Sequence, residues 1–114
     1  MEPVSCKNAE HYLWSDICHG WHLLKSSGLS VIQKMVPPGG AKVAHYHEHA
    51  HQFFFILAGT ATLEIAGHRM ELVSQQGISV PAKTHHRLLN EADTELIFLL
   101  ISAPPSHGDR VLAV

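Results

Sequence analysis

Histidines occupy every second position between residues 45 and 51. The four residues are His45, His47, His49 and His51. Side chains two residues apart on an extended chain point to the same side of that chain. Neutral imidazole is the most common protein ligand of transition metals. The spacing therefore predicts a metal site in this part of the chain.

The rest of the sequence predicts short β-strands around this run. Segments rich in β-branched or alternating apolar residues are separated by Gly, Pro, Asn and Asp turns, at intervals of about eight to twelve residues. The expected strands are residues 29–36, 42–46, 53–57, 60–66, 69–73, 78–80, 86–89 and 95–101. No segment has a convincing helical period. This pattern is typical of an all-β protein in which two antiparallel sheets enclose one core.

Length and composition limit the function classes. A chain of 114 residues, 46% of them hydrophobic, is expected to form one domain. Its formal net charge of −2 gives no electrostatic reason to expect nucleic acid or a membrane as a partner. Cys6 and Cys18 lack the spacing of a zinc knuckle, which favours free thiols in a reducing compartment. Because no signal-like or membrane-spanning stretch is present, we expect a cytoplasmic protein.

Two sets of motif residues add to this reading. The first set runs from Gly39 through His45 and His47, with Gln52 four residues after the second histidine and Gly59 after a further six. This set resembles the first motif of the cupin superfamily, in which a glutamate usually stands where this chain has Gln52.

The second set is Pro81, His86 and Asn90. It resembles the second cupin motif and lies at the expected distance from the first. The resemblance implies an antiparallel double-sheet jelly-roll barrel over residues 29–103. Residues 1–28 would then be an N-terminal arm or strands packed on the barrel, and residues 104–114 a C-terminal tail. Asn90 is expected to serve in a turn or to close the barrel through hydrogen bonds.

The resemblance implies a metal held by His45, His47, Gln52 and His86. We prefer Gln52 to His51 as the fourth ligand because the interval to Gly59 is kept from Gln52. His51 would lie one residue out of register, on the opposite face of a strand. Neutral imidazoles and a neutral amide favour a divalent transition metal, Ni, Fe, Zn, Cu or Co, over Mg or Ca.

The chain departs from the second motif at two positions that are usually glycine, which are Gln75 and Lys83. We expect Gly77 to relax the first of these turns. At Lys83 we expect a residue with a Cβ to adopt a backbone conformation that usually belongs to glycine.

Further residues are assigned by strand alternation. We expect a pocket lined by Phe54, Ile56, Leu63 and Leu88, with His49, His51 and His85 near the metal ligands but not binding the ion. Phe53, Phe55 and Leu57 would face the other way. A second subunit would cover them in a homodimer. In the alternative, Trp14 and Trp21 of the N-terminal segment supply the cover.

The expected function is a reaction on a small organic molecule at the metal, of an oxygenase-like, lyase or isomerase type. The residues do not identify a separate catalytic acid or base. The alternative is a binding or sensing protein in which the same pocket holds a metal or a small ligand without turnover, and the absence of the usual carboxylate favours it.

Overall fold

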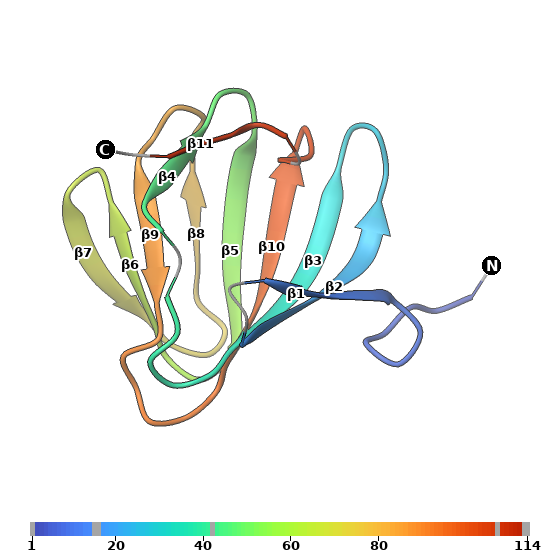
Figure 1. Cartoon of the computed structure of the whole chain (residues 1–114), viewed down its shortest axis with the longest axis horizontal. Helices are drawn as coiled ribbons and strands as arrows, with labels where there is room; N and C mark the ends of the chain where they lie inside the picture. The colour runs from blue at the N-terminus through green and yellow to red at the C-terminus, as the bar shows by residue number, and fades with distance from the viewer. Residues whose placement is uncertain (1, 15–16, 42, 107, 113–114) are drawn as a thin grey trace.

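The computed structural model describes residues 2–14, 17–41, 43–106 and 108–112, and in these ranges the chain forms eleven β-strands in two antiparallel sheets (Figure 1). The first sheet has the order β1 (Glu10–Trp14), β2 (Cys18–Lys25), β3 (Ser30–Val36), β10 (Leu96–Ala103), β5 (His51–Ala58) and β8 (Gly77–Val80). The second has the order β11 (Arg110–Leu112), β4 (His45–His47), β9 (His86–Leu89), β6 (Ala61–Ile65) and β7 (His68–Leu72). The all-β jelly-roll prediction is confirmed, as two facing sheets rather than one continuous barrel.

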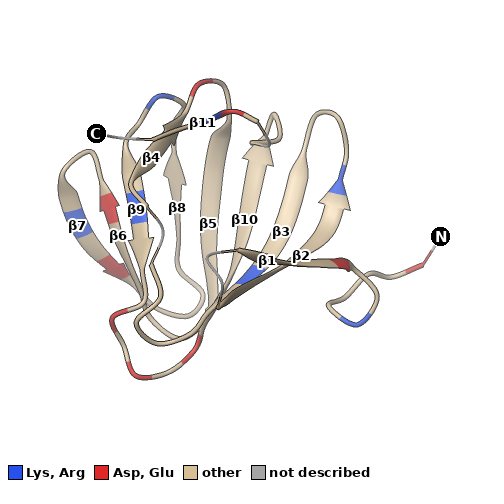
Figure 2. Cartoon of the chain, in the orientation of Figure 1, with Lys and Arg blue, Asp and Glu red and all other residues tan. Residues whose placement is uncertain are grey.

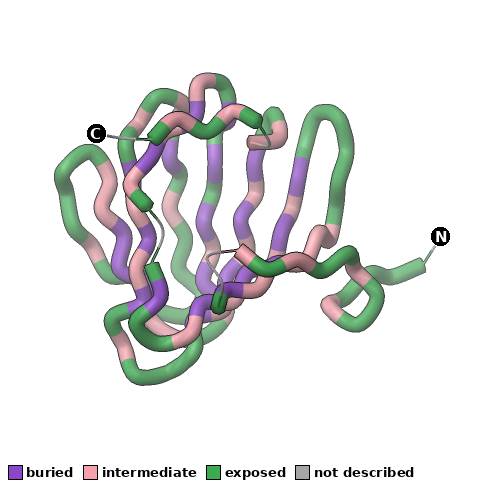
Figure 3. Tube along the Cα trace, viewed as in Figure 1, coloured by how far each residue is buried: buried purple, intermediate pink, exposed green. Residues whose placement is uncertain are grey.

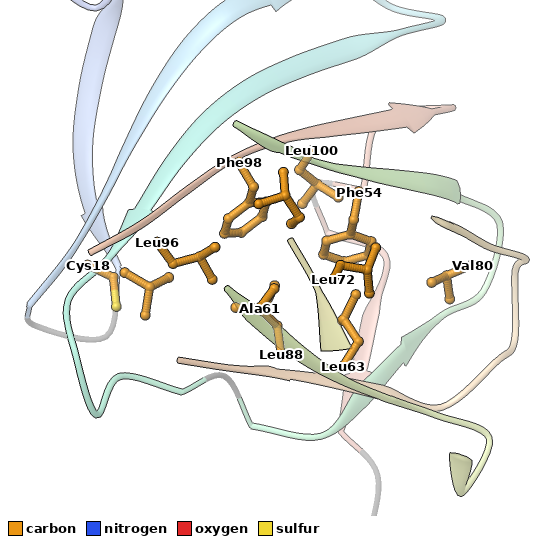
Figure 4. Close-up of a cluster of buried hydrophobic side chains, with 12 residues drawn as sticks. Cys18, Phe54, Ala61, Leu63, Leu72, Val80, Leu88, Leu96, Phe98 and Leu100 are labelled. Carbon is orange, nitrogen blue, oxygen red and sulfur yellow. The ribbon is translucent and has the colours of Figure 1, made fainter. Parts of the chain in front are cut away.

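The hydrophobic core fills the space between the sheets. Along β10, buried and half-buried residues alternate because successive side chains of a strand point to opposite faces, a pattern that Figure 3 shows in several strands. Phe54 of β5 and Phe98 of β10 stack at a centroid distance of 5.9 Å in the centre of the core (Figure 4). Both are fully buried. Burial of each such side chain contributes about 1.5–3 kcal/mol to the free energy of unfolding, because apolar surface is removed from water.

The two ends of the chain both enter the sheets. The N-terminal segment supplies β1 and β2, and β2 pairs with β3 from Lys25↔Ser30 to His19↔Met35. The C-terminal segment supplies β11, which pairs with β4 so that Arg110 lies opposite His47. Strand β11 has no equivalent in the sequence-based expectations. Among the described residues, no helix is long and apolar enough to cross a membrane.

Asn90 joins the two sheets at one end of the molecule. Its side-chain Nδ2 donates to the carbonyl oxygens of Val36 and Thr94, both at 2.9 Å. Its backbone pairs with the glycine turn, since Gly39 N donates to Asn90 O and Asn90 N donates to Gly40 O, each at 2.9 Å. The side chain is 1% exposed. These contacts agree with the expectation that Asn90 serves in a turn or closes the barrel through hydrogen bonds.

The two departures from motif glycines both adopt left-handed backbone. Lys83 has φ 66°, as expected, and Gln75 has φ 70°. Gly77 is not among the glycines with positive φ, so the expectation that Gly77 relaxes this turn is wrong. Gly77 instead begins β8, where a Cβ would lie 2.5 Å from Cζ of Phe53. It is glycine because of this close approach, and Gln75 carries the turn.

This strain predicts opposite effects at two neighbouring glutamines. Gln75→Gly should raise the free energy of unfolding by about 0.5–1 kcal/mol, because relief of the left-handed conformation outweighs the added entropy of the unfolded chain. Gln76→Gly is the control. Its side chain accepts a hydrogen bond from Val73 N at 2.9 Å and its φ is not positive, so it should destabilise the protein. Urea unfolding of both variants measures the difference, and an unstable Gln75→Gly would contradict the assignment.

Candidate metal centre

Three of the predicted ligands lie together between the sheets. Antiparallel pairing of β4 with β9 places His45 directly opposite His86, and His47 is two residues further along β4 on the same face. The candidate ligand atoms of these three histidines all lie within 4.8 Å of one another. The side chains are 2%, 6% and 4% exposed for His45, His47 and His86, respectively. Such a buried group of imidazoles has the size of a metal site.

Backbone carbonyls orient two of the three rings. Nδ1 of His45 lies 2.8 Å from Val43 O, and Nδ1 of His86 lies 2.9 Å from Thr84 O. A carbonyl oxygen only accepts, so Nδ1 carries the hydrogen in both rings. The lone pair is then on Nε2, the arrangement that metal-binding histidines use. The same contact, to the carbonyl two residues earlier, is thus repeated on β4 and β9.

Gln52, the predicted fourth ligand, is buried in the same cavity. It begins the inward face of β5 and is 2% exposed. Its Nε2 donates to Oγ of Ser102, on the neighbouring strand β10, at 3.0 Å. Within the described part of the chain its Oε1 accepts no hydrogen bond, although it is buried. A buried amide oxygen that accepts no hydrogen bond lowers the stability of the fold, and coordination to a bound cation would remove this cost.

The donor set fits a transition metal. Three neutral imidazoles and one amide oxygen would hold a divalent ion and leave coordination positions for water or a substrate. No carboxylate contributes charge, so the site does not resemble the oxygen-rich cages that bind Ca²⁺ or Mg²⁺. Ni, Fe, Zn, Cu and Co all match this chemistry.

The other predicted histidines lie outside the cluster. His51 is exposed on the face of β5 opposite to Gln52, as the register argument requires. His49 is exposed, and its backbone N donates to the carboxylate of Asp109 at 2.9 Å. His85 is exposed and stacks on Tyr46 with parallel rings at a centroid distance of 4.9 Å.

Asp109 fixes the turn that follows the two histidines of β4. Its carboxylate accepts hydrogen bonds from the backbone N of His49 and of Ala50, the latter at 2.8 Å. Partial desolvation, the largest single influence, raises the pKa of Asp109. The two backbone donors and the nearby His49 and His47 together outweigh it, so the pKa lies below its ordinary value. The carboxylate is therefore ionised at neutral pH and holds the end of β4 in place.

The predicted pocket residues lie in the core instead. Phe54, Ile56, Leu63 and Leu88 are all 0% exposed and belong to one cluster of buried side chains. Figure 4 shows Phe54, Leu63 and Leu88 within this cluster. The ring of Phe54 meets His86 edge-on at 5.9 Å, so this residue supports a candidate ligand. None of the four is among the described residues that line the cavity beside His45 and His47. Inward-facing residues near the start of β5 line the cavity, whereas those further along the strand belong to the hydrophobic core.

The cavity has a volume of about 300 Å³ and opens beside His45, His47 and Gln52. Its remaining walls come from residues that sequence reasoning did not single out. They are Tyr12, Trp14, Lys34, Leu100, Ser106, Gly108 and Arg110. Two of them had a detectable signal, since Lys34 is in phase with the inward-facing Ile32 and Val36, and Leu100 with Phe98. The others depend on how the chain ends fold over the barrel.

Tyr12 forms a wall of this cavity because glycine is its partner across the β1–β2 pair. Tyr12 lies opposite Gly20, and a Cβ on Gly20 would lie 2.5 Å from Cζ of Tyr12. The ring of Tyr12 therefore packs directly against the backbone of Gly20. Burial raises the pKa of the Tyr12 hydroxyl, so this group is a protonated donor at neutral pH.

Comparisons with known proteins agree with this architecture. The family model described as Cupin domain matches residues 33–102. An uncharacterized protein of Methanocaldococcus jannaschii is 28% identical over 89 residues, which cover 77% of this chain and 71% of that protein.

Two solved structures show the same fold at low sequence identity. The structure of KdgF from Halomonas sp. has a TM-score of 0.83 at 13% identity, over 91% of this chain and 95% of that one. A predicted oxalate decarboxylase from Thermotoga maritima has a TM-score of 0.81 at 18% identity, over 90% of this chain and 98% of that one. At these identities the likeness concerns the fold alone.

The Gln52 assignment predicts the effect of restoring a carboxylate. Gln52→Glu should tighten binding of Ni²⁺ or Zn²⁺ by roughly tenfold or more, because a negative charge is added beside a divalent ion. The same variant should be less stable without metal, since the carboxylate is buried. Isothermal titration with each metal measures the first effect and thermal unfolding the second. His51→Glu, on the outer face of the same strand, is the control and should leave both unchanged. Equal tightening in the two variants would remove Gln52 from the ligand set.

Proposed function

Because the chain belongs to the cupin domain family, whose model matches residues 33–102, we propose that His45, His47, His86 and Gln52 bind a divalent transition metal and that the metal-loaded cavity acts on a small organic molecule. The observation that carries the proposal is the buried Oε1 of Gln52, which shares a cavity with His45 and His47 and accepts no hydrogen bond from the described residues. When bound, the metal would act as a Lewis acid that polarises a substrate oxygen.

The protein's own groups around the cavity are hydrogen-bond donors rather than bases. Burial raises the pKa of the Tyr12 hydroxyl, so it keeps its proton at neutral pH, and the lining also includes the basic side chains Lys34 and Arg110. The described lining includes no aspartate or glutamate. These groups can bind and orient oxygen atoms of a substrate and stabilise negative charge that develops on them. A reaction of the lyase, isomerase or oxygenase type that needs such stabilisation, and no carboxylate base, fits the site.

The alternative is a protein that binds or senses a small ligand or a metal without turnover. The neutral amide at position 52, in place of the usual glutamate, favours this reading because an amide cannot act as a general base. Where the alternative protein also holds the metal, the two readings differ only in turnover.

The adjacent histidines at the start of β9, His86 in the strand and His85 just before it, give a matched test. His86→Ala should lose the bound metal and, with it, metal-dependent conversion of substrate, while His85→Ala should keep both, because His85 is exposed and stacks on Tyr46. Metal content is measured by mass spectrometry after loading with Ni²⁺, Fe²⁺ or Zn²⁺. Conversion is followed by oxygen uptake and product analysis with small phenols, thiols, diketones and organic acids.

Each outcome decides between the readings. Metal bound by the wild type and by His85→Ala, with turnover of a compound, supports the enzyme. Metal bound without turnover of any compound favours the binding or sensing protein. A wild-type protein that takes up no metal, and whose melting temperature ignores chelators, would exclude the enzyme and the metal-binding form of the alternative.

We also propose that the outer face of the first sheet forms a homodimer. Phe53 and Phe55 alternate with buried residues of β5, stack at 6.4 Å and lie opposite Ile101 and Leu99 of β10. Phe53 is 38% exposed. Figure 2 shows charged residues on β6, β7 and β9, where Glu64 pairs with Arg69 and Arg87, whereas β5, β8 and β10 carry none. An uncharged face suits a second copy of itself, because a two-fold interface places the same residues on both sides.

The tryptophans do not supply this cover. Trp14 lines the inner cavity. Trp21 is on β2, separated from β5 by the two strands β3 and β10, and packs near His11 and His19. Light scattering should therefore give twice the monomer mass for the wild type and the monomer mass for Phe53→Lys. Val73→Lys changes an exposed apolar residue that follows β7 and should leave the dimer intact. A monomeric wild type would contradict the dimer.

A further inference from the structure

Two further histidines approach each other on the outer face of the first sheet, away from the cavity. Nε2 of His11, on β1, lies 2.7 Å from Nδ1 of His19, on β2. The ring centroids are 4.9 Å apart and the ring planes differ by 24°. With the nitrogens so much closer than the centroids, the rings meet nitrogen to nitrogen and nearly in one plane. Each ring therefore directs one of its metal-binding atoms at the other ring.

The pairing of β1 with β2 places this histidine pair beside a tryptophan. His11 lies directly opposite Trp21, and His19 is two residues before Trp21 on β2, so the three side chains share one face. The centroid of the Trp21 ring lies 5.3 Å from that of His11 and 5.8 Å from that of His19. Strand β1 is at the edge of the sheet and His11 is exposed. Ions in solution can therefore reach the pair.

A thioether lies next to the same pair. Met35 of β3 is directly opposite His19 across the β2–β3 pair. It occupies a half-buried, outward position, since the residues on either side of it, Lys34 and Val36, are buried inward residues of β3. Directly opposed side chains of antiparallel strands have Cβ atoms about 4.5–5.5 Å apart, and the methionine side chain is long and flexible. Met35 therefore adds a soft sulfur donor within reach of two imidazoles.

Binding of an ion by both rings requires only a small movement. Two nitrogens that hold one ion at about 2.0–2.1 Å in tetrahedral geometry are about 3.3 Å apart, so the 2.7 Å contact must open by about 0.6 Å. Because His11 is exposed on an edge strand, its ring can turn without disturbing the core. The ion takes the place of the hydrogen that lies between the two nitrogens in the metal-free pair.

We propose that His11, His19 and Met35 form a second metal site, which binds Cu⁺ on the outer face of the first sheet. Two imidazoles and a thioether are neutral, soft or borderline ligands, and a thioether favours Cu⁺ over the harder divalent ions. The nearby indole of Trp21 adds a ring face that attracts cations. None of the three ligands is among the described residues that line the inner cavity, so this inference does not rest on the proposed function.

Copper binding by the full chain tests the site. With a colorimetric Cu⁺ chelator as competitor, under anaerobic reducing conditions, the wild type should bind one more Cu⁺ per chain than His11→Ala. His68→Ala is the matched control, because it removes an exposed histidine of β7 on the other sheet, and it should keep the wild-type stoichiometry. Met35→Leu nearly conserves volume and should weaken binding of the additional ion by roughly tenfold or more.

Tryptophan emission reports where the ion binds. The chain has two tryptophans, so Trp14→Phe leaves Trp21 as the only one. Its emission should fall when Cu⁺ is added, because the ion binds beside the indole. The double variant Trp14→Phe, His11→Ala should show no such change. Thermal unfolding of each variant verifies that it is folded before copper is added.

Three results would overturn the proposal. They are equal copper stoichiometry in the wild type and His11→Ala, emission of Trp21 that does not respond to Cu⁺, and unchanged Cu⁺ affinity in Met35→Leu. Either of the first two leaves a hydrogen-bonded histidine pair without a metal function, and the third removes the sulfur ligand that selects copper. None of them bears on the metal centre between the sheets, which is tested separately through His86→Ala.

Discussion

Three imidazole rings and one amide are buried beside a hydrophobic core, and the rest of the structure depends on how their polar atoms are satisfied. Buried polar groups need partners, so two rings are tied through Nδ1 to backbone carbonyls and the amide of Gln52 is tied to Ser102. These contacts use one polar atom of each of those groups. The opposite atoms, Nε2 of His45 and His86 and Oε1 of Gln52, are those that a metal would take. The same hydrogen bonds thus fix the side chains and select the atoms available for chemistry.

Holding this arrangement requires the two sheets to keep their distance and register. The pairing of His45 with His86 sets the register of β4 on β9, and Asn90 connects the end of β9 to the turn after β3. At the other end, Asp109 holds the turn after β4 while β11 pairs along it. A jelly roll with open edges is thereby closed by side-chain and backbone hydrogen bonds at both ends of β4 and β9. The cluster lies between these two fixed points.

The chain ends decide the character of the cavity. Strand β1 brings Tyr12 and Trp14 over the mouth, and the C-terminal segment brings Ser106 and Arg110. Neither segment carries a proposed ligand of the metal between the sheets, yet together with Lys34 they supply the basic side chains and the aromatic walls of the cavity. The core strands therefore set where a metal would bind, and the ends set what would bind beside it. This division is common in folds that host many chemistries on one scaffold.

The sequence alone predicted most strands of the two sheets, the candidate ligand residues and the place of Asn90, because each depends on local alternation or on motif spacing. Alternation also put Gln52 inward and His51 outward. Only the tertiary structure decided that Phe54, Ile56, Leu63 and Leu88 belong to the core and that Tyr12, Lys34 and Arg110 face the cavity. It also decided that Gln75, not Gly77, adopts the left-handed turn. The physical reason is that strand periodicity fixes which face a side chain takes. What that face meets depends on segments far apart in the chain, brought together only when the sheets close.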